Sequence, residues 1–256
     1  MLLVWVLRIA LVSTLLLGWE YASGDVIPEF FVSRPSAIAE VLAGWIGSGR
    51  LFLHAGITLT EALSGFIIGG LAGMVVGVVL ARSRLLGQVL DPFILMFYSL
   101  PKVALAPLFV IWFGIGMEMK ITLTATIVFF LVFLSTYTGV KNVSRELEAI
   151  MHLMGAKERH VLAKVVLPSA VTWVFTGLRL SVPYALIGAI VGELIVSNRG
   201  LGYLLSNAAG QFNTAGVFAA LTAIVALALL LNFAVRIIER LVMPWQRDQD
   251  VREMSI

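Results

Sequence analysis

The sequence contains no cysteine, which excludes disulfide bonds, thiolate metal sites and catalysis by a thiol. It is also poor in charge, because only 13% of its 256 residues are charged, compared with about 25% in a typical soluble domain. Its three histidines stand singly, so the sequence indicates no metal site. Apolar residues are abundant instead and make up 60% of the chain. This balance predicts an integral membrane protein.

The apolar residues form runs that are long enough to cross a bilayer, which takes about 20 residues of helix. We predict an all-α, polytopic protein with about six transmembrane helices, at residues 2–18, 54–81, 89–113, 121–140, 171–195 and 215–238. The first run has a second interpretation as a cleaved signal peptide. No charged region leads it, so we favour a retained first span. Apolar residues at helical spacing after Pro35 predict an interfacial amphipathic helix.

The basic residues predict the orientation of the spans. The turn at 82–84, the loop at 141–164 and the C-terminal tail are all basic, and two spans separate each from the next. By the positive-inside rule, all three face the cytoplasm, and the N-terminus does as well. Because topology explains the net charge of +3, the charge does not indicate nucleic-acid binding.

Four glycines, Gly65, Gly69, Gly73 and Gly77, follow one another at intervals of four residues in the second span. Small residues at this spacing form a flat stripe that lets another helix approach closely. The stripe is either a moving packing face or ordinary tight packing.

Ionisable residues inside spans are costly and indicate function by default. Glu61 either faces the pathway, pairs with Arg179 or Lys102, or reaches the headgroups. Lys102 follows Pro101, where a broken helix would form a pathway wall, or it extends to the interface. Arg179 either attracts an anionic solute or forms a structural ion pair.

Two further acids, Asp91 and Glu193, lie near span ends, and we expect them to be solvated or to cap helices.

The loop at 141–168 carries the most informative pattern. Leu147, Ile150, Met151 and Met154 recur at the spacing of one helix face, and Gly155 ends that helix. An exposed apolar stripe of this kind must be buried against the bundle, against lipid or in the groove of another protein.

This loop resembles the cytoplasmic coupling loop of binding-protein-dependent ABC importer permeases. That family's pattern is Glu-Ala-Ala, three residues, Gly, nine residues and Ile-x-Leu-Pro, and here Gly155 precedes Val165-Val166-Leu167-Pro168 by nine residues. The first half departs from the pattern, because Ala149, Ile150 and Met151 occupy the Glu-Ala-Ala positions and Glu148 lies one residue early. The resemblance implies that the residues coupling to an ATPase are Glu148, Ala149, Met151, Leu153, Gly155, Ala156 and Pro168.

Other motifs are similar to the nitrate, sulfonate and taurine branch of this family, which also includes carriers of pyrimidine and vitamin precursors. They are Pro101–Leu108, Trp112–Gly116, Asp91-Pro92, Gly177–Arg179, Gly192-Glu193, Gly200–Gly202, His54 and Thr58-Leu59. The resemblance implies a type I ABC importer permease-like bundle over residues 1–256, in the bacterial inner membrane, which forms the pathway for a small solute. It also implies four partners: a dimer of ATP-binding subunits, an extracytoplasmic solute-binding protein, a second permease copy in a homodimer, and membrane lipid.

The chain has no phosphate-binding loop of its own. We therefore expect it to be no enzyme and to carry no cofactor, with ATP and magnesium bound by the partner ATPase. A secondary transporter would need inverted repeats or acidic relays, and a membrane enzyme would need a metal or nucleophile motif. The sequence favours neither.

Overall fold

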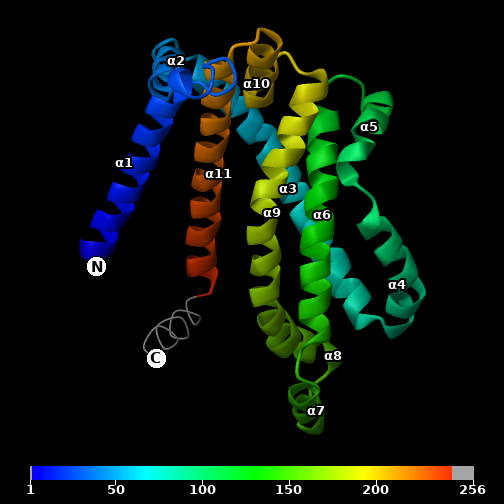
Figure 1. The fold of residues 1–256 in the computed structure, drawn as a ribbon. Coiled ribbons are helices and arrows are strands. Elements are labelled where there is room, and N and C mark those ends of the chain that lie inside the picture. Colours follow the sequence, from blue (N-terminus) through cyan, green and yellow to red (C-terminus); the bar gives the residue numbers. More distant parts are fainter. Residues whose placement is uncertain (1, 244–256) are drawn as a thin grey trace. The chain divides into compact units, whose positions relative to one another are not determined.

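The computed structural model describes residues 2–243, and helices account for its regular elements apart from one isolated bridge between Ser23 and Ile27. In chain order they are α1 (Leu2–Asp25), α2 (Pro35–Gly47), α3 (Arg50–Arg82), α4 (Arg84–Ser99), η1 (Lys102–Leu105), α5 (Ala106–Phe113), α6 (Met117–Lys141), α7 (Arg145–Leu153), α8 (Glu158–Val161), η2 (Leu162–Val166), α9 (Leu167–Val196), α10 (Leu201–Gly210) and α11 (Thr214–Val242) (Figure 1).

Five of these helices are long and apolar enough to cross a membrane. The bent pair Pro92–Ser99 and Lys102–Phe113 makes a sixth if it counts as one span. The prediction of an all-α protein with about six spans is therefore confirmed.

The described residues form two compact units. The first combines residues up to Thr58 with Glu193–Leu227, and the second combines Leu59–Gly192 with residues from Ala228 onward.

In the first unit, α1 presents its apolar side chains outward along its whole length, as expected of a helix that faces lipid. The helical conformation of α1 is interrupted at Gly24, where φ is +101°. The predicted interfacial helix is α2, and its first turn is capped by Glu20, whose carboxylate accepts hydrogen bonds from Ser36 N at 3.0 Å and Ser36 Oγ at 2.6 Å. Glu20 satisfies a first-turn N–H group that has no partner within the helix.

The second unit is built around α6, and the glycine stripe of α3 packs directly on it. A Cβ added at Gly73 would lie 2.6 Å from the Phe129 carbonyl oxygen, and one added at Gly77 would lie 2.8 Å from Thr136 Cβ. Gly65 and Gly69 meet α6 in the same way. The stripe therefore gives two helix backbones a contact that a side chain would prevent.

The predicted third span is broken in the structure. Its two helical segments, Pro92–Ser99 and Lys102–Phe113, are bent by 79° relative to each other. Pro101 has no N–H to donate and disfavours a helical conformation at Leu100, whose ψ is 133°. Pro107 lies in the first turn of α5, where a proline is tolerated.

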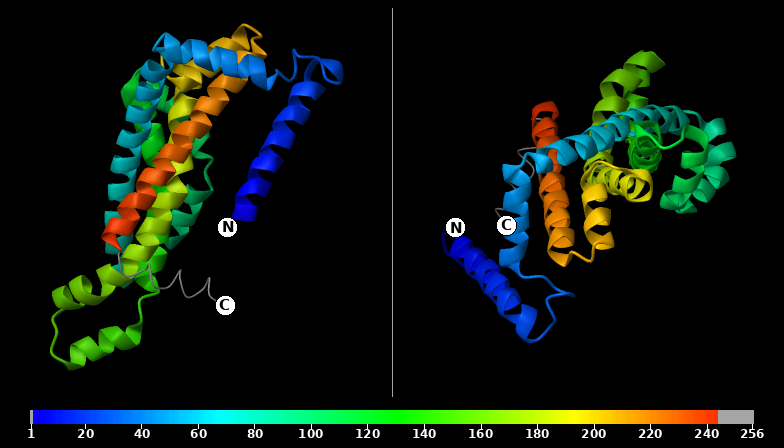
Figure 2. Two further views of the ribbon diagram at one scale, coloured as in Figure 1. Left: turned by 90° about the vertical axis from the view of Figure 1, so that its left-hand side faces the viewer. Right: turned by 90° about the horizontal axis from the view of Figure 1, so that it is seen from above.

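Within the second unit, α7 and α8 project beyond the ends of α6 and α9 (Figures 1 and 2). The C-terminal part of α11 ends on the same side as these two short helices (Figure 1).

Candidate functional site

The helix α7 begins and ends as the sequence predicts. Ser144 Oγ accepts a hydrogen bond from Leu147 N at 3.3 Å and so caps the N-terminus. At the other end Gly155 has φ +77°, its N–H donates to His152 O at 2.9 Å, and Ala156 N donates to Met151 O at 3.0 Å. These two bonds make a Schellman motif, which requires the left-handed conformation that glycine adopts readily.

The apolar face of α7 divides into two parts. Met151 turns inward and packs, with Ala156, against buried residues that include Val161 and Val166. The rest of the face stays exposed in this chain. Its side chains are Leu147, Ile150, Leu153 and Met154, with exposed fractions of 51%, 52%, 88% and 78%.

A π-helical turn leads from the loop into α9. Leu167 N–H bonds to the Leu162 carbonyl, five residues back, and Val166 is fully buried. Pro168 is the second residue of α9 and directly follows this turn. The loop is thus anchored at its C-terminal end by apolar packing.

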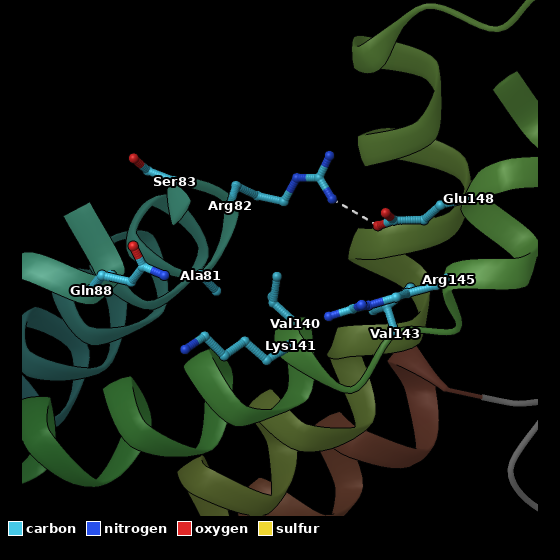
Figure 3. Close-up of a pocket in the computed structure, with 10 residues that line it drawn as sticks. Ala81, Arg82, Ser83, Gln88, Val140, Lys141, Val143, Arg145 and Glu148 are labelled. Carbon is cyan, nitrogen blue, oxygen red and sulfur yellow. Dashed lines mark hydrogen bonds and ion pairs between the residues drawn. The ribbon is translucent and has the colours of Figure 1, made fainter. Parts of the chain in front are cut away.

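Arg82, the last residue of α3, joins both short helices of the loop. Its guanidinium contacts Glu148 of α7 at 2.7 Å and Glu158 of α8 at 2.8 Å, and Figure 3 shows it turned toward Glu148. The acid one residue early in the coupling motif is therefore bound within the chain. An open pocket of about 610 Å³ lies beside these groups, and Lys141 and Arg145 also line it (Figure 3).

Sequence reasoning missed the part played by Arg82 and Glu158. The positive-inside rule fully accounted for a basic residue at 82, so nothing marked it further. The acid at 158 has no place in the family pattern. Only the fold shows that both meet α7.

The charged residues of the spans find partners other than those considered from the sequence. Glu61 pairs with Lys120 of α6, and both side chains are buried. Neither Arg179 nor Lys102 is its partner. Arg179 instead contacts Glu239 at 3.3 Å, which matches the structural interpretation of that arginine. Lys102 Nζ donates to the Tyr98 carbonyl oxygen.

Glu193 is 1% exposed, so of the two roles expected for it, solvated or helix-capping, the structure shows the capping one. Its carboxylate accepts hydrogen bonds from Thr58 Oγ1 and from Gly202 N, both at 2.6 Å. Thr58 Oγ1 accepts in turn from Leu201 N at 2.8 Å, and His54 Nδ1 accepts from Gly200 N at 2.9 Å. Glu193 and its neighbours cap the N-terminus of α10, a helix that sequence patterns did not predict. The side chain of Asp91 lies outside the described part of the structure.

These contacts join motifs that stand far apart in the sequence. His54, Thr58, Glu193 and the Gly200–Gly202 turn belong to separate motifs that are similar to the branch. In the first unit they form one hydrogen-bonded cluster. Gly200 has φ +107°, and it lies so close to the Glu193 carboxylate that a Cβ atom would not fit there. The glycine is thus required by both backbone and space.

Residues 65–248 match the family described as "Binding-protein-dependent transport system inner membrane component". This match covers most of the chain and agrees with the helix–turn–helix loop. The chain belongs to this family. It is a transport subunit of the membrane and not an enzyme, as the sequence predicted.

Curated relatives resemble this permease over nearly its whole length. The putative aliphatic sulfonates transport permease protein SsuC of Bacillus subtilis is 30% identical over 96% of this chain and 90% of that protein. The formylaminopyrimidine transport permease protein ThiX of Halalkalibacterium halodurans is 29% identical over 92% and 94%. The taurine transport system permease protein TauC of Escherichia coli is 32% identical over 89% and 84%.

The solved structures agree on the fold of this permease. An inward-facing structure of the MetNI methionine ABC transporter aligns with a TM-score of 0.64 at 21% identity, over 73% of this chain and 93% of that one. The family match and the curated relatives confirm the recognition of an ABC importer permease from the sequence.

Proposed function

We propose that this permease, with a second copy of itself, forms the pathway for a small organic solute, and that α7 and α8 couple it to a partner ATPase. Sulfonates, taurine and pyrimidine-type precursors are the first solute classes to test, because the relatives are named for them. A solute-binding protein delivers the solute from outside.

The observation that carries the coupling role is the exposed apolar face of α7. Leu153 is 88% exposed on a helix whose two ends are both capped. A rigid helix that presents apolar side chains at adjacent turns fits the groove of another protein. In this proposal the groove belongs to the ATPase, and α7 docks as a preformed unit.

The membrane orientation follows from the same proposal. The loop at 141–168 and both termini lie in the cytoplasm, and lipid surrounds the spans. Within the second unit, the end of α11 and the projecting helices α7 and α8 lie on one side (Figure 1), which supports a common compartment.

ATP drives transport by biasing two packings of the bundle. Movement of the docked loop reaches α3 through Arg82, which contacts both Glu148 and Glu158. Because the glycine stripe of α3 lies against α6, those two helices move together. The same loop reaches α9 through its packed π-helical turn.

The test is co-purification of the ATPase with a Leu153→Asp permease from native membranes. We expect the ATPase to be lost while the permease itself is recovered, because a charge replaces a desolvated contact. Val26→Asp is the matched control, since Val26 is 79% exposed and lies outside the loop. An unchanged amount of ATPase with Leu153→Asp would refute the docking face.

Gly155→Val tests the shape of the loop. A β-branched residue is strained at φ +77°, although no atom stands within 4 Å of the site to clash with its Cβ. ATPase recovery and ATP-driven uptake should fall while membrane insertion continues. Normal recovery together with normal uptake would count against the coupling loop.

A further inference from the structure

A pocket of about 400 Å³ opens in the second unit where the third span breaks. Its lining comes from three parts of the chain, namely the segment around the break, the middle of α6 and the middle of α9. A pocket of this size suits a small ligand, since ligand sites commonly measure about 300–1,000 Å³.

The break itself supplies the pocket's cation. Because α4 ends at Ser99, the last carbonyl groups of α4 have no helical partner. Lys102 turns back and donates to the Tyr98 carbonyl, where a cation is also favoured by the helix dipole. The ammonium group is thereby held at the pocket wall.

Aromatic rings surround this ammonium group. Lys102 Nζ lies 4.6 Å from the centre of the Tyr98 ring and 4.9 Å from that of Phe130. Tyr184 of α9 lines the same pocket, and aliphatic side chains such as Ile127 and Ile187 complete it. The pocket thus combines one fixed positive charge with apolar and aromatic walls.

Lys102 differs from two other cations in the spans of this unit. Lys120 is neutralised by Glu61, and Arg179 contacts Glu239. No carboxylate among the described side chains forms an ion pair with Lys102. Its charge is therefore available to a ligand.

We propose that this pocket is a solute-binding site of the transport pathway, and that it takes an organic anion with a compact apolar body, of the alkanesulfonate kind. The Lys102 ammonium binds the anionic head, and the rings of Tyr98, Phe130 and Tyr184 contact the apolar part. This assignment rests on the proposed function and specifies the chemistry of its pathway.

The absence of cysteine makes the site directly testable. A single Ile187→Cys places one thiol at the pocket wall in the assembled transporter. The probes are two membrane-impermeant methanethiosulfonates of similar size, one carrying a sulfonate and one a trimethylammonium group, and labelling of this chain is read by mass. We expect the sulfonate reagent to react faster. Adding Lys102→Gln should lower the ratio of the two rates about tenfold, as expected for the loss of one charge-assisted contact.

The controls separate this site from a lipid-filled groove. Lys102→Arg should keep the faster reaction with the sulfonate reagent. A thiol placed at Ser48 should show a ratio of the two labelling rates that does not change when residue 102 is substituted. A ratio at 187 that is unchanged by Lys102→Gln overturns the proposal. So does a thiol that reacts only with a membrane-permeant maleimide, because lipid would then occupy the pocket.

Uptake by the reconstituted complex distinguishes failure of this proposal from failure of the proposed function. With radiolabelled butanesulfonate and the binding protein present, Lys102→Gln should raise the KM for uptake about tenfold, while Arg236→Gln, which removes an equal charge, should not. Equal KM values in wild type and Lys102→Gln would overturn the pocket alone. A wild-type complex that imports no sulfonate would refute the sulfonate assignment of the proposed function, and the labelling ratio would still decide whether the pocket attracts anions.

Discussion

Glu193 and Glu148 are both acids that contact another helix of this chain, yet one is buried and the other is partly exposed to solvent. Glu193 is 1% exposed, and its carboxylate accepts from a threonine hydroxyl and a backbone N–H. The Glu148 side chain is 25% exposed and pairs with Arg82 at the edge of an open pocket (Figure 3). The first network is closed to solvent, while the second lies next to apolar side chains of α7 that stay exposed among residues 2–243.

This difference in exposure to solvent separates a region that holds the fold together from a region that can bind another protein. A buried polar group without a partner is costly, so a closed network holds its elements in one arrangement. An exposed ion pair contributes about 0–1 kcal/mol and can be rearranged cheaply. We infer that the Glu193 cluster fixes the short helix α10, whereas the Arg82 cluster positions a surface that engages another protein.

The largest effect should come from breaking the buried Glu61–Lys120 pair. Lys120→Met leaves the Glu61 carboxylate buried without its cation, which typically costs about 3–5 kcal/mol. The permease should then unfold at a clearly lower temperature in detergent and be recovered in smaller amount.

The double variant Glu61→Leu, Lys120→Met sharpens this test. Removing both charges also removes the desolvation cost, so most of the lost stability should return. If the double variant were as unstable as Lys120→Met, packing and not charge would explain the loss.

The comparison between Glu193 and Glu148 is tested by alanine at each position. Glu193→Ala removes the acceptor for Thr58 Oγ1 and Gly202 N, and it should cost about 1–3 kcal/mol in the free energy of unfolding. Glu148→Ala should cost less than about 1 kcal/mol. Similar shifts in the unfolding temperature of the two variants would contradict the distinction between closed and open networks.

The sequence predicts the spans and the coupling loop because both depend on local patterns. Apolar runs, the basic segments between them and the glycine at 155 are each visible without the fold. The Schellman motif at Gly155 shows how directly such a local signal becomes geometry.

The pairing of distant groups was not predictable in the same way. Glu61 meets Lys120 and Glu193 meets Thr58, at separations that no periodicity records. The short helix α10 was missed for a related reason, since its N-terminus is capped by a carboxylate from α9 and not by a neighbouring residue. The pocket at Lys102 also needs α6 and α9 to complete it.

A smaller effect on stability, which involves no charged group, is expected where α3 meets α6. Gly73→Ala puts a methyl group 2.6 Å from the Phe129 carbonyl oxygen, so the helices must separate, at a cost of about 1–3 kcal/mol. Gly56→Ala on the same helix meets nothing within 4 Å and should be neutral or slightly stabilising. Thermal unfolding in detergent measures both. Equal stability of the two variants would show that the stripe is not a close contact.

The smallest effect on stability should come from Arg82→Gln, although its effect on coupling should be large. Both ion pairs of Arg82 are partly exposed, so their loss should change the free energy of unfolding by no more than about 1 kcal/mol. Arg82 is nevertheless the charged link from α3 to both α7 and α8, and without it the loop can dock on the ATPase and move without carrying α3 along. We therefore expect normal recovery of the ATPase, continued ATP hydrolysis and less solute imported per ATP, measured in vesicles.

Lys157→Gln is the control, because it removes a charge from the same loop without breaking an ion pair described in the structure. It should leave the amount of solute imported per ATP unchanged. If Arg82→Gln lowered hydrolysis and uptake in equal proportion, Arg82 would serve docking and not the transmission of movement.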